Sequence, residues 1–511
     1  MKQFLFSIIL SVFSIIASLA QGQQQVVPGE FPDPSIIEVN GTYYATASSN
    51  NWAPLFPLYK SSDLINWTFV NYIFKDAPLW TISDYWAPEL FYNNGTFYCY
   101  YTARNKKGIS CIGVATAKNI ENGFIDRGPV LEWGNEAIDA FVYKENDMLY
   151  ITWKAYGLTP GRSIQLLGCR LTDDGLAIKG DAFEILTADK NSWEDGGTEG
   201  QCIVKHNGYL YMLYSGNACC GGYCNYKVGV ARAKTMAGPW EKYPGGPILE
   251  SNDTWKCPGH GTALTTNGKW FYLYHAYPVK GFPYLGRTGI LSELHWDEQS
   301  GWPYFKAEST NTDIITHNIK DEFEDKKLAN WWRYDVAASN FSTSIKSGRL
   351  TITEQNKKDK AVGGAALCVV PDDADFTVTT KVVNRNSVLK GLVLYATTAN
   401  SIGLGVQGSD LVLWKIKDDK FIVLNRITIA NYYTEIHFKA NVKNANLIQF
   451  TYSTDGKNWN AIRDRTSQSE TVTGDNLAWW SWGMKTGLYV SADGKSTENI
   501  GVFDEFEINY N

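Results

Sequence analysis

Residues 208–214 read Gly208-Tyr-Leu-Tyr-Met-Leu-Tyr214, a turn glycine followed by an aromatic-rich apolar run. Such a run after an Asn-Gly-type turn is typical of a strand in a β-hairpin. The same pattern begins at four more turn residues, which are Gly41, Gly95, Asp147 and Gly268. The copies start roughly 50 to 60 residues apart, the length of a four-stranded propeller blade. Because amphipathic helix patterns are missing between them, the sequence predicts an all-β protein with a five-bladed β-propeller.

A polar residue interrupts an otherwise apolar strand a few residues before each of these turns. In chain order these residues are Asp33, Glu89, Asp139, Glu199 and His260. If the blades are equivalent, all five begin innermost strands, which line the central channel of a propeller. The sequence therefore predicts four carboxyl groups and one imidazole gathered at one end of the channel.

Carboxylates that lie close together raise one another's pKa values, so that one of them keeps its proton near neutral pH. Glycoside hydrolysis needs such a pair, an acid for the leaving oxygen and a carboxylate that activates water or attacks. The chain also has 19 Trp and 30 Tyr. Their flat, partly polar rings suit the binding of a sugar.

The residues around these positions resemble the family 43 glycoside hydrolases, five-bladed propeller enzymes that include arabinofuranosidases, β-xylosidases and arabinanases. The resemblance runs in order from about residue 28 to 310. It is carried by Phe31-Pro-Asp-Pro-Ser35, Tyr85-Trp-Ala-Pro-Glu89, Ile138-Asp139 with Phe141, Thr198-Glu-Gly200, Gly259-His-Gly261 and Gly286-Arg287. It implies hydrolysis with inversion at the anomeric carbon and no required cofactor.

The resemblance also implies a role for each carboxyl group. Asp33 resembles the general base that activates water, and Glu199 resembles the general acid. Asp139 resembles the third carboxylate, which orients the acid and tunes its pKa. Ala140 departs from the family, whose members often have proline after this aspartate. Glu89 is interpreted as a structural hydrogen-bonding residue behind the site.

Other positions are expected to contact the substrate. His260 resembles an imidazole near the channel axis that in some relatives helps to hold a calcium ion through waters. Arg287 resembles an arginine that reaches the sugar or a catalytic carboxylate. Four tryptophans near the expected loops are candidates for stacking on sugar, with core packing as the alternative: Trp52, Trp80, Trp86 and Trp193.

Several functions fit this reading. The first is an inverting exo-acting hydrolase that releases α-L-arabinofuranosyl units from plant arabinan, arabinoxylan or a related polysaccharide. The same chemistry would also serve a β-D-xylosidase, or an enzyme releasing galactose or galactofuranose. A non-catalytic carbohydrate-binding propeller would be expected to lack a catalytic carboxylate. A retaining enzyme of the invertase type lacks support, because its Asn-Asp-Pro-Asn and Arg-Asp-Pro signatures are missing.

The N-terminus reads as an export signal. Lys2 precedes an apolar run over residues 4–19 that ends in small residues, so residues 1–20 are predicted to be a signal peptide cleaved near Ala20. The expected location is secreted or periplasmic. The net charge of −6, without basic blocks, argues against nucleic acid and anionic membrane as partners.

The nine cysteines of an exported chain suggest disulfides, with at least one cysteine unpaired. The cluster Cys219-Cys220-Gly-Gly-Tyr-Cys224 is interpreted as a disulfide-pinned loop. Zinc is the weaker reading, because no second matching pair and no nearby histidine accompany the cluster. Which cysteines pair stays open.

The repeat stops near Trp302-Pro303. We expect the catalytic propeller over residues 21–310, a linker over 311–320 and a β-sandwich over 321–511, where short strands alternate with turns. Similar first and last strands, Asp321-Glu-Phe-Glu and Asp504-Glu-Phe-Glu, are expected to pair in one sheet. This part resembles concanavalin/laminin-G-like sandwiches appended to family 43 propellers. It would buttress the propeller, bind carbohydrate, with Trp479, Trp480 and Trp482 as the platform, or send a loop to the active-site rim.

Overall fold

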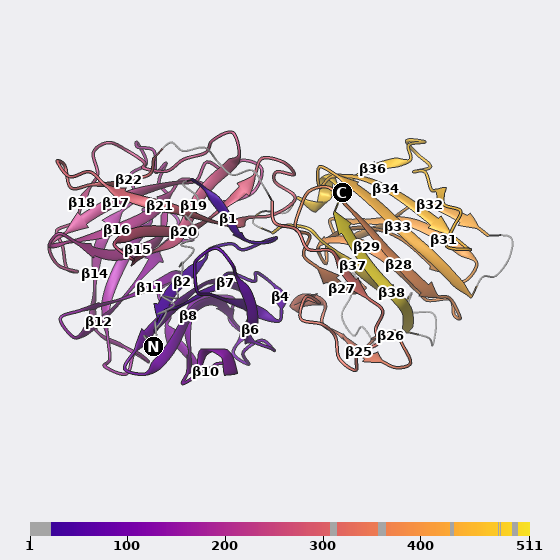
Figure 1. Ribbon diagram of the computed structural model, residues 1–511, viewed down its shortest axis with the longest axis horizontal. Helices are drawn as coiled ribbons and strands as arrows, with labels where there is room; N and C mark the ends of the chain where they lie inside the picture. Colours follow the sequence, from indigo (N-terminus) through magenta and orange to yellow (C-terminus); the bar gives the residue numbers. More distant parts are fainter. Residues whose placement is uncertain are drawn as a thin grey trace, which may run out of the picture.

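The computed structural model describes residues 22–306, 314–355, 364–429, 434–478, 480, 482–492 and 499–510. Two bodies of strands lie side by side (Figure 1). Within these residues the only helical elements are three short 3₁₀ turns: η1 (Ile120–Asn122), η2 (Val336–Ala338) and η3 (Asp475–Leu477). Among the described residues, none forms a helix with the length and hydropathy of a membrane span. The predicted all-β class is confirmed.

The first body consists of five antiparallel sheets, each of which is one blade. Blade 1 contains β2 (Ser35–Val39), β3 (Thr42–Thr46), β5 (Leu55–Ser61) and β6 (Thr68–Phe74). Blade 2 contains β7 (Thr81–Asn93), β8 (Thr96–Asn105), β9 (Ser110–Ala117) and β10 (Ile125–Leu131). Blade 3 contains β11 (Ala137–Glu145), β12 (Met148–Ala155), β13 (Gln165–Leu171) and β14 (Ile178–Thr187). Blade 4 contains β15 (Thr198–His206), β16 (Tyr209–Gly216), β17 (Lys227–Ala233) and β18 (Glu241–Lys242).

Blade 5 closes the ring. It joins β19 (Trp255–Thr266), β20 (Lys269–Pro278) and β21 (Thr288–Trp296) to β1 (Gln24–Val27) from the other end of the domain, and β22 (Pro303–Tyr304) adds to β21. The innermost strands β2, β7, β11, β15 and β19 each lie against the next one, and β19 lies against β2. The predicted five-bladed propeller is therefore present.

The hairpins form where the sequence predicts them. Asn207 and Gly208 have φ angles of 43° and 76°, and the third blade uses Asn146 and Asp147 at 48° and 66°. A tight hairpin turn of this kind needs positive φ at both central residues, which asparagine, aspartate and glycine tolerate best. The aromatic side chains that follow the turns fill the space between blades, with Tyr101, Trp153, Tyr214 and Tyr274 fully buried.

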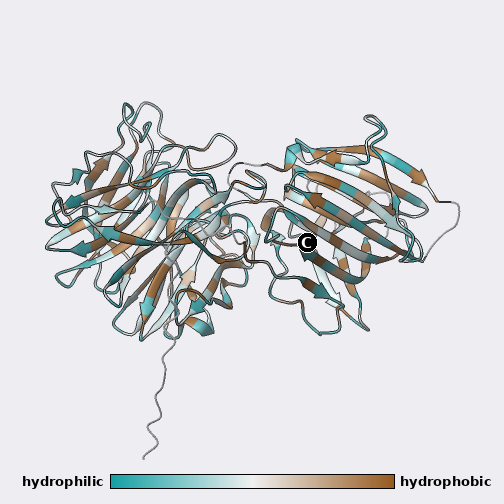
Figure 2. Ribbon diagram, turned by 45° about the horizontal axis from the view of Figure 1, so that its top comes forward, coloured by the Kyte–Doolittle hydropathy of each residue, from teal (hydrophilic) through white to brown (hydrophobic). Residues whose placement is uncertain are grey.

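The second body is a sandwich of two antiparallel sheets around one apolar core. Polar and apolar residues are interleaved along its strands (Figure 2). One sheet contains β23 (Ile319–Asp321), β25 (Phe341–Ile345), β26 (Leu350–Glu354), β28 (Phe376–Val383), β33 (Glu435–Lys443), β34 (Leu447–Ser453), β35 (Asn460–Ala461), β36 (Thr471–Thr473) and β38 (Ile500–Tyr510). The other contains β27 (Ala365–Val369), β29 (Leu389–Thr397), β30 (Asn400–Gln407), β31 (Asp410–Lys417), β32 (Lys420–Thr428) and β37 (Lys485–Ser491). The expected pairing of first and last strands is confirmed, because Asp321 lies opposite Phe506.

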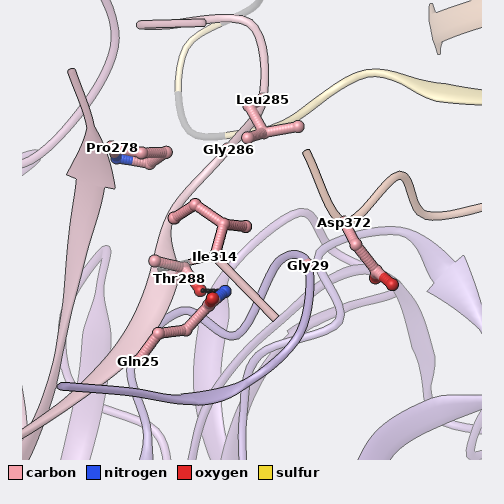
Figure 3. Close-up of a pocket in the computed structure, with 8 residues that line it drawn as sticks. All are labelled: Gln25, Gly29, Pro278, Leu285, Gly286, Thr288, Ile314 and Asp372. Atoms are coloured by element: carbon pink, nitrogen blue, oxygen red, sulfur yellow. Dashed lines mark hydrogen bonds between the residues drawn. The ribbon is translucent and has the colours of Figure 1, made fainter. Parts of the chain in front are cut away.

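Polar contacts join the two bodies. The short strand β4 (Trp52–Ala53) pairs with β24 (Tyr334–Asp335). The guanidinium of Arg333 donates to the Ser49 hydroxyl at 2.8 Å and to the Trp52 carbonyl at 2.6 Å. A cavity of about 10 Å³, enough for one water molecule, also lies where the two bodies meet. Figure 3 shows the residues that line it, among which Gln25 donates to Thr288 at 2.8 Å. The signal peptide predicted over residues 1–20 and part of the predicted linker lie outside the described residues.

Candidate active site

The innermost strands change direction where they reach the end of the channel. Five residues there have positive φ, which are Asp33 (51°), Ala87 (42°), Asp139 (59°), Gly200 (59°) and His260 (42°). In β7, β11, β15 and β19 a break in the ladder register spans the same place. Such bulges redirect side chains and recur beside active sites. Here they turn the polar residues of neighbouring blades toward one another.

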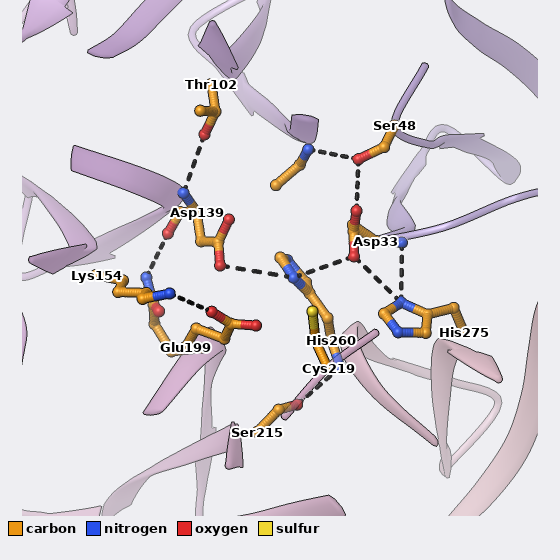
Figure 4. Close-up of polar contacts among 12 residues, drawn as sticks. Asp33, Ser48, Thr102, Asp139, Lys154, Glu199, Ser215, Cys219, His260 and His275 are labelled. Carbon is orange, nitrogen blue, oxygen red and sulfur yellow. Dashed lines mark hydrogen bonds and ion pairs between the residues drawn. The ribbon is translucent and has the colours of Figure 1, made fainter. Parts of the chain in front are cut away.

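These turned residues are tied to the preceding blade. The backbone N–H of Asp33 donates to His275 Nδ1 at 3.0 Å, and that of Asp139 donates to Thr102 Oγ1 at 3.1 Å. Equivalent bonds run from Ala87 to Ser48 Oγ at 2.7 Å and from His260 to Ser215 Oγ at 2.7 Å. A belt of hydrogen bonds thus links one blade to the next around the channel (Figure 4).

Sequence reasoning missed the second-strand members of this belt, although the repeat contains a signal for them. Each stands at the same distance after its hairpin turn: Ser48, Thr102, Lys154, Ser215 and His275. Four of these residues accept a hydrogen bond from a backbone N–H of the next blade, whereas Lys154 cannot, because an ammonium group has no acceptor. Its Nζ instead donates to Glu199 Oε2 at 2.6 Å. The repeat is therefore broken in blade 3, at the residue that faces the predicted acid Glu199 of blade 4.

Asp33 is held as an ionised carboxylate. Arg287 Nη1 donates to its Oδ1 at 2.7 Å, and the Ser48 hydroxyl donates to its Oδ2 at 2.6 Å. Burial alone would raise the pKa of Asp33, but Arg287 and the neighbouring His275 and His260 hold it well below its usual value. Burial and Arg287 lower the pKa of His275 to about 4, so this ring is neutral and its Nδ1 accepts the Asp33 N–H. An ionised, desolvated carboxylate of this kind suits a general base.

Asp139 and Glu199 differ in protonation. Burial, opposed by His260, raises the pKa of Asp139 to about 7, with the Glu199 charge adding to the rise. Burial would also raise the pKa of Glu199, but Lys154 lowers it below its usual value, helped by the Tyr226 hydroxyl, which donates to Oε1 at 2.9 Å. Below about pH 7 the free protein therefore keeps a proton on Asp139, while Glu199 is ionised. The acid role of Glu199 stays a prediction, and the sequence contains no sign of the ion pair that Lys154 makes with this carboxylate.

His260 lies between the carboxylates. Its Nδ1 is 3.5 Å from Asp33 Oδ1 and 3.8 Å from Asp139 Oδ2 (Figure 4). Gly200 makes this position available, since a Cβ there would come within 2.7 Å of the His260 ring. Within the described residues, no three His, Cys, Asp or Glu side chains could hold a metal ion. The calcium ion expected near His260 is therefore not supported.

The structure separates the four candidate tryptophans. Trp52 is only 1% exposed and packs edge-on against Tyr395 of the sandwich, so the predicted stacking on sugar is wrong and the alternative, core packing, holds. Trp80 lies over Gly113 and Trp193 over Gly229, where a Cβ would clash with either ring. Both side chains are half-buried and pack against the glycines of a blade, so neither ring presents an open face on which a sugar could stack.

Trp86 stands with a partner from the other body. Its ring contacts the Trp480 ring edge-on, with 5.5 Å between the ring centroids. Trp480 is 51% exposed. The sandwich thus sends a loop to the β7 end of the site, one of the three expected roles. Trp479 lies outside the described residues.

Glu89 is not at the ring position that the sequence assigns to it. The bulge residue of its strand is Ala87, and Glu89 follows two residues later, as Ser35 follows Asp33 and Thr262 follows His260. It is buried, its Oε2 accepts from Thr262 at 3.5 Å, and burial raises its pKa to about 8. Glu89 is therefore a neutral carboxyl group behind the site, as expected of a structural residue.

The predicted disulfide-pinned loop is present. Disulfides join Cys219 to Cys220 and Cys224 to Cys257, and the five other cysteines are free and buried. The second bridge ties the loop to β19, the strand of His260. Figure 4 shows Cys219 beside His260 in projection.

Comparison with known proteins agrees with this geometry. Residues 23–303 match the family described as glycosyl hydrolases family 43, and residues 320–509 match the β-xylosidase C-terminal concanavalin A-like domain. A xylan 1,3-β-xylosidase of a Vibrio species is 26% identical over 499 residues, covering 86% of this chain and 90% of the relative. A non-reducing end α-L-arabinofuranosidase of Bacteroides ovatus is 26% identical over 381 residues, 68% of each chain.

The fold is shared with a solved xylan β-1,4-xylosidase from Bacillus halodurans. That structure superposes with a TM-score of 0.80 at 20% identity and covers 96% of this chain and 100% of its own. The family match spans the whole propeller, more than half of the chain, and includes every carboxylate of the site. The chain belongs to family 43 of the glycosyl hydrolases and is a glycosidase.

Proposed function

We propose that this enzyme is an exported, inverting exo-glycosidase that releases terminal α-L-arabinofuranosyl units from plant cell-wall polysaccharide such as arabinan or arabinoxylan. The observation that carries the mechanism is the difference in protonation among three converging carboxyl groups. Asp33 is ionised beside Arg287, while Asp139 and Glu199 hold one proton between them at neutral pH. Paired carboxyls in opposite states are what general acid–base hydrolysis needs.

In this proposal a water between Asp33 and the anomeric carbon loses its proton to Asp33 as its oxygen bonds to that carbon. On the opposite face the glycosidic C–O bond breaks, and Glu199 gives a proton to the leaving oxygen. We assign the transfer to Glu199 because its side chain is 16% exposed, against 7% for Asp139. Asp139 then acts as the reservoir from which Glu199 is protonated.

The sugar is the second part of the proposal. Relatives named as an endo-α-(1→5)-L-arabinanase, a non-reducing end α-L-arabinofuranosidase and an exo-α-(1→5)-L-arabinofuranosidase favour an arabinofuranosyl unit. The second candidate is a terminal β-D-xylosyl unit, because two relatives that cover most of both domains are a xylan 1,3-β-xylosidase and a β-xylosidase, and the sandwich matches a β-xylosidase domain. The Trp480 ring stands against Trp86, next to Ala87 at the channel end, and a side chain of the second body at this place would favour action at chain ends.

The first test is a panel of aryl α-L-arabinofuranoside, β-D-xyloside, β-D-galactoside and β-D-galactofuranoside. Asp33→Asn should lower kcat on the favoured glycoside roughly 10²- to 10⁴-fold, the range expected for loss of a general base. Glu199→Gln should hurt substrates with poor leaving groups most, since good leaving groups need little protonation. Glu121→Gln, at a half-buried ion pair with Lys60, is the matched control and should retain wild-type rates.

The anomer formed first, followed by NMR, decides between inversion and retention. Wild-type rates in a folded Asp33→Asn protein would overturn the mechanism. Equal losses in Glu199→Gln on good and poor leaving groups, with a leaving-group dependence in Asp139→Asn instead, would transfer the acid role to Asp139.

A further inference from the structure

In Figure 1 the strands β4 and β6 of the propeller face the second body. Two adjoining cavities lined by residues of both bodies form a groove along this seam. A cavity of about 590 Å³ forms one part of it, and a cavity of about 740 Å³ forms the other. The two parts share Tyr72, Ala329 and Asn330. Asp33, Asp139 and Glu199 do not line either part, so the groove is separate from the catalytic carboxylates.

Aromatic side chains form one wall of the 590 Å³ part. Tyr59 contacts Phe69 edge-on at 5.5 Å, and Phe69 contacts Tyr72 at 5.1 Å, so the rings form a ladder along blade 1. Trp67 stands on the same side, and Trp331 of the opposite wall is 41% exposed. Large aromatic surfaces left open in a concave site mark a binding site more often than a packing fault.

The opposite wall is polar but offers no unpaired charge among its described groups. His317 lies 3.6 Å from Asp372, and Glu30 is paired with Lys485. The guanidinium of Arg333 donates to Ser49 and to the carbonyls of Trp52 and Pro54. In the 590 Å³ part a charged ligand would find its counter-ions already engaged, whereas a neutral ligand with many hydroxyl groups would find side-chain amides at Asn318 and Asn330. The lysines of the groove, Lys75, Lys326 and Lys327, line the 740 Å³ part instead.

We propose that this seam groove is a second carbohydrate-binding site, which holds a stretch of neutral polysaccharide outside the catalytic channel. The apolar faces of sugar rings would stack on Trp331, Trp67 and Tyr72, and hydroxyl groups would reach the asparagines. The choice of ligand class rests on the proposed function, but binding does not require the catalytic groups. A second anchor of this kind raises the local concentration of polymer ends without altering the reaction.

The test uses the full chain with Asp33→Asn, so that bound polymer is not degraded. Soluble arabinan, arabinoxylan and xylan are cast into native gels, and retardation gives the affinity. We expect Trp331→Ala to weaken binding of the retained polymer roughly 3- to 10-fold, the loss of one aromatic contact. Trp459→Ala, a half-buried tryptophan beside Lys439 on the sandwich, is the matched control and should bind like the parent.

In the Asp33-intact enzyme, Trp331→Ala should leave kcat/KM for an aryl glycoside unchanged and lower the rate on polymer by a similar factor. Equal retardation of Trp331→Ala and its parent, or no retardation of the parent by any of the three polymers, would overturn the inference. A concentration-dependent dimer lost in Trp331→Ala would also overturn it and make a second copy the occupant. None of these results depends on which aryl glycoside is cleaved. The outcome of the glycoside panel therefore tests the proposed function independently of the groove.

Discussion

Lys154 sets the difference between the two carboxyl groups on the acid side. It is the belt residue that cannot accept a hydrogen bond, and its charge lowers the pKa values of both Glu199 and Asp139. If the shared proton is needed for catalysis, kcat/KM falls as pH rises through about 7, the pKa of Asp139. Lys154→Met removes the charge, so both pKa values should rise and the alkaline limb of the pH profile should move to higher pH.

The measurement is kcat/KM against pH on an activated aryl glycoside. Lys154→Arg keeps the charge and should leave the limb close to its wild-type position. A limb that stays in place or moves to lower pH in Lys154→Met would contradict this account of the acid side, whatever happens to the absolute rate.

Glu89 provides a second test at the residue scale. Burial raises its pKa to about 8, so the folded protein keeps a proton that the unfolded chain releases above its ordinary value of 4.5. Between these two values stability falls as pH rises, by about 1.4 kcal/mol per unit at most, and above about 8 the loss is complete. Glu89→Gln has no proton to lose. Relative to wild type it should gain stability between pH 5 and pH 8, on the order of a few kcal/mol.

Denaturant unfolding at pH 5 and pH 8 measures this change. Glu121→Gln, at a half-buried carboxylate paired with Lys60, should show no comparable gain. An equal offset between Glu89→Gln and wild type at both pH values would show that Glu89 is not a neutral buried carboxyl group.

At the scale of elements, hairpins were predictable because their cause is local. The turn residues and the aromatic runs stand side by side in the sequence, and unusual polar residues such as Asp139 stand out in an apolar strand. Ser48 and Thr102 do not stand out, because serine and threonine at strand ends are ordinary; only alignment of the five turns reveals them. Trp52 was misjudged because β4 pairs with β24, a contact between distant segments that no local pattern announces.

The loop after β16 is the element whose covalent tie can be tested. Cys224 and Cys257, 33 residues apart in sequence, join this loop to β19. Replacing both with serine removes a constraint worth about 4 kcal/mol in the chain-entropy model. Tyr226 follows the loop and holds Glu199, so the variant should also turn over more slowly. Thermal unfolding and kcat measure the two effects, and a variant that melts and turns over like wild type would show that the bridge is dispensable.

At the scale of the molecule, the sandwich completes the propeller. Strand β24 pairs with β4, and Trp480 contacts Trp86 at the site. The Arg333 guanidinium donates hydrogen bonds to three acceptors of the propeller, at Ser49, Trp52 and Pro54. In each contact a polar group or a ring of one body has its partner in the other body. The two bodies should therefore unfold together, and loss of their contacts should affect stability before it affects chemistry.

The buried pair of Lys485 and Glu30 is the sharpest test of this coupling. Both side chains are almost fully buried, Lys485 also donates to the Gly483 carbonyl at 2.7 Å, and Glu30 accepts from the Gly483 N–H at 3.1 Å. Lys485→Met leaves the Glu30 carboxylate buried without its cation, a loss of about 3 to 5 kcal/mol. Lys485→Met with Glu30→Gln removes both charges and should recover most of this loss, since a neutral pair carries no uncompensated charge.

Scanning calorimetry of the full chain separates the outcomes. Wild type and the double variant should unfold in one joint transition, whereas Lys485→Met should melt earlier or in two steps, as the bodies uncouple. Lys320→Met, at the exposed pair with Glu322, should change the midpoint little, because exposed ion pairs contribute at most about 1 kcal/mol. If the single and double variants melt alike, the penalty comes from lost packing of Lys485, and coupling between the bodies must then depend on Arg333 and the β4–β24 pairing.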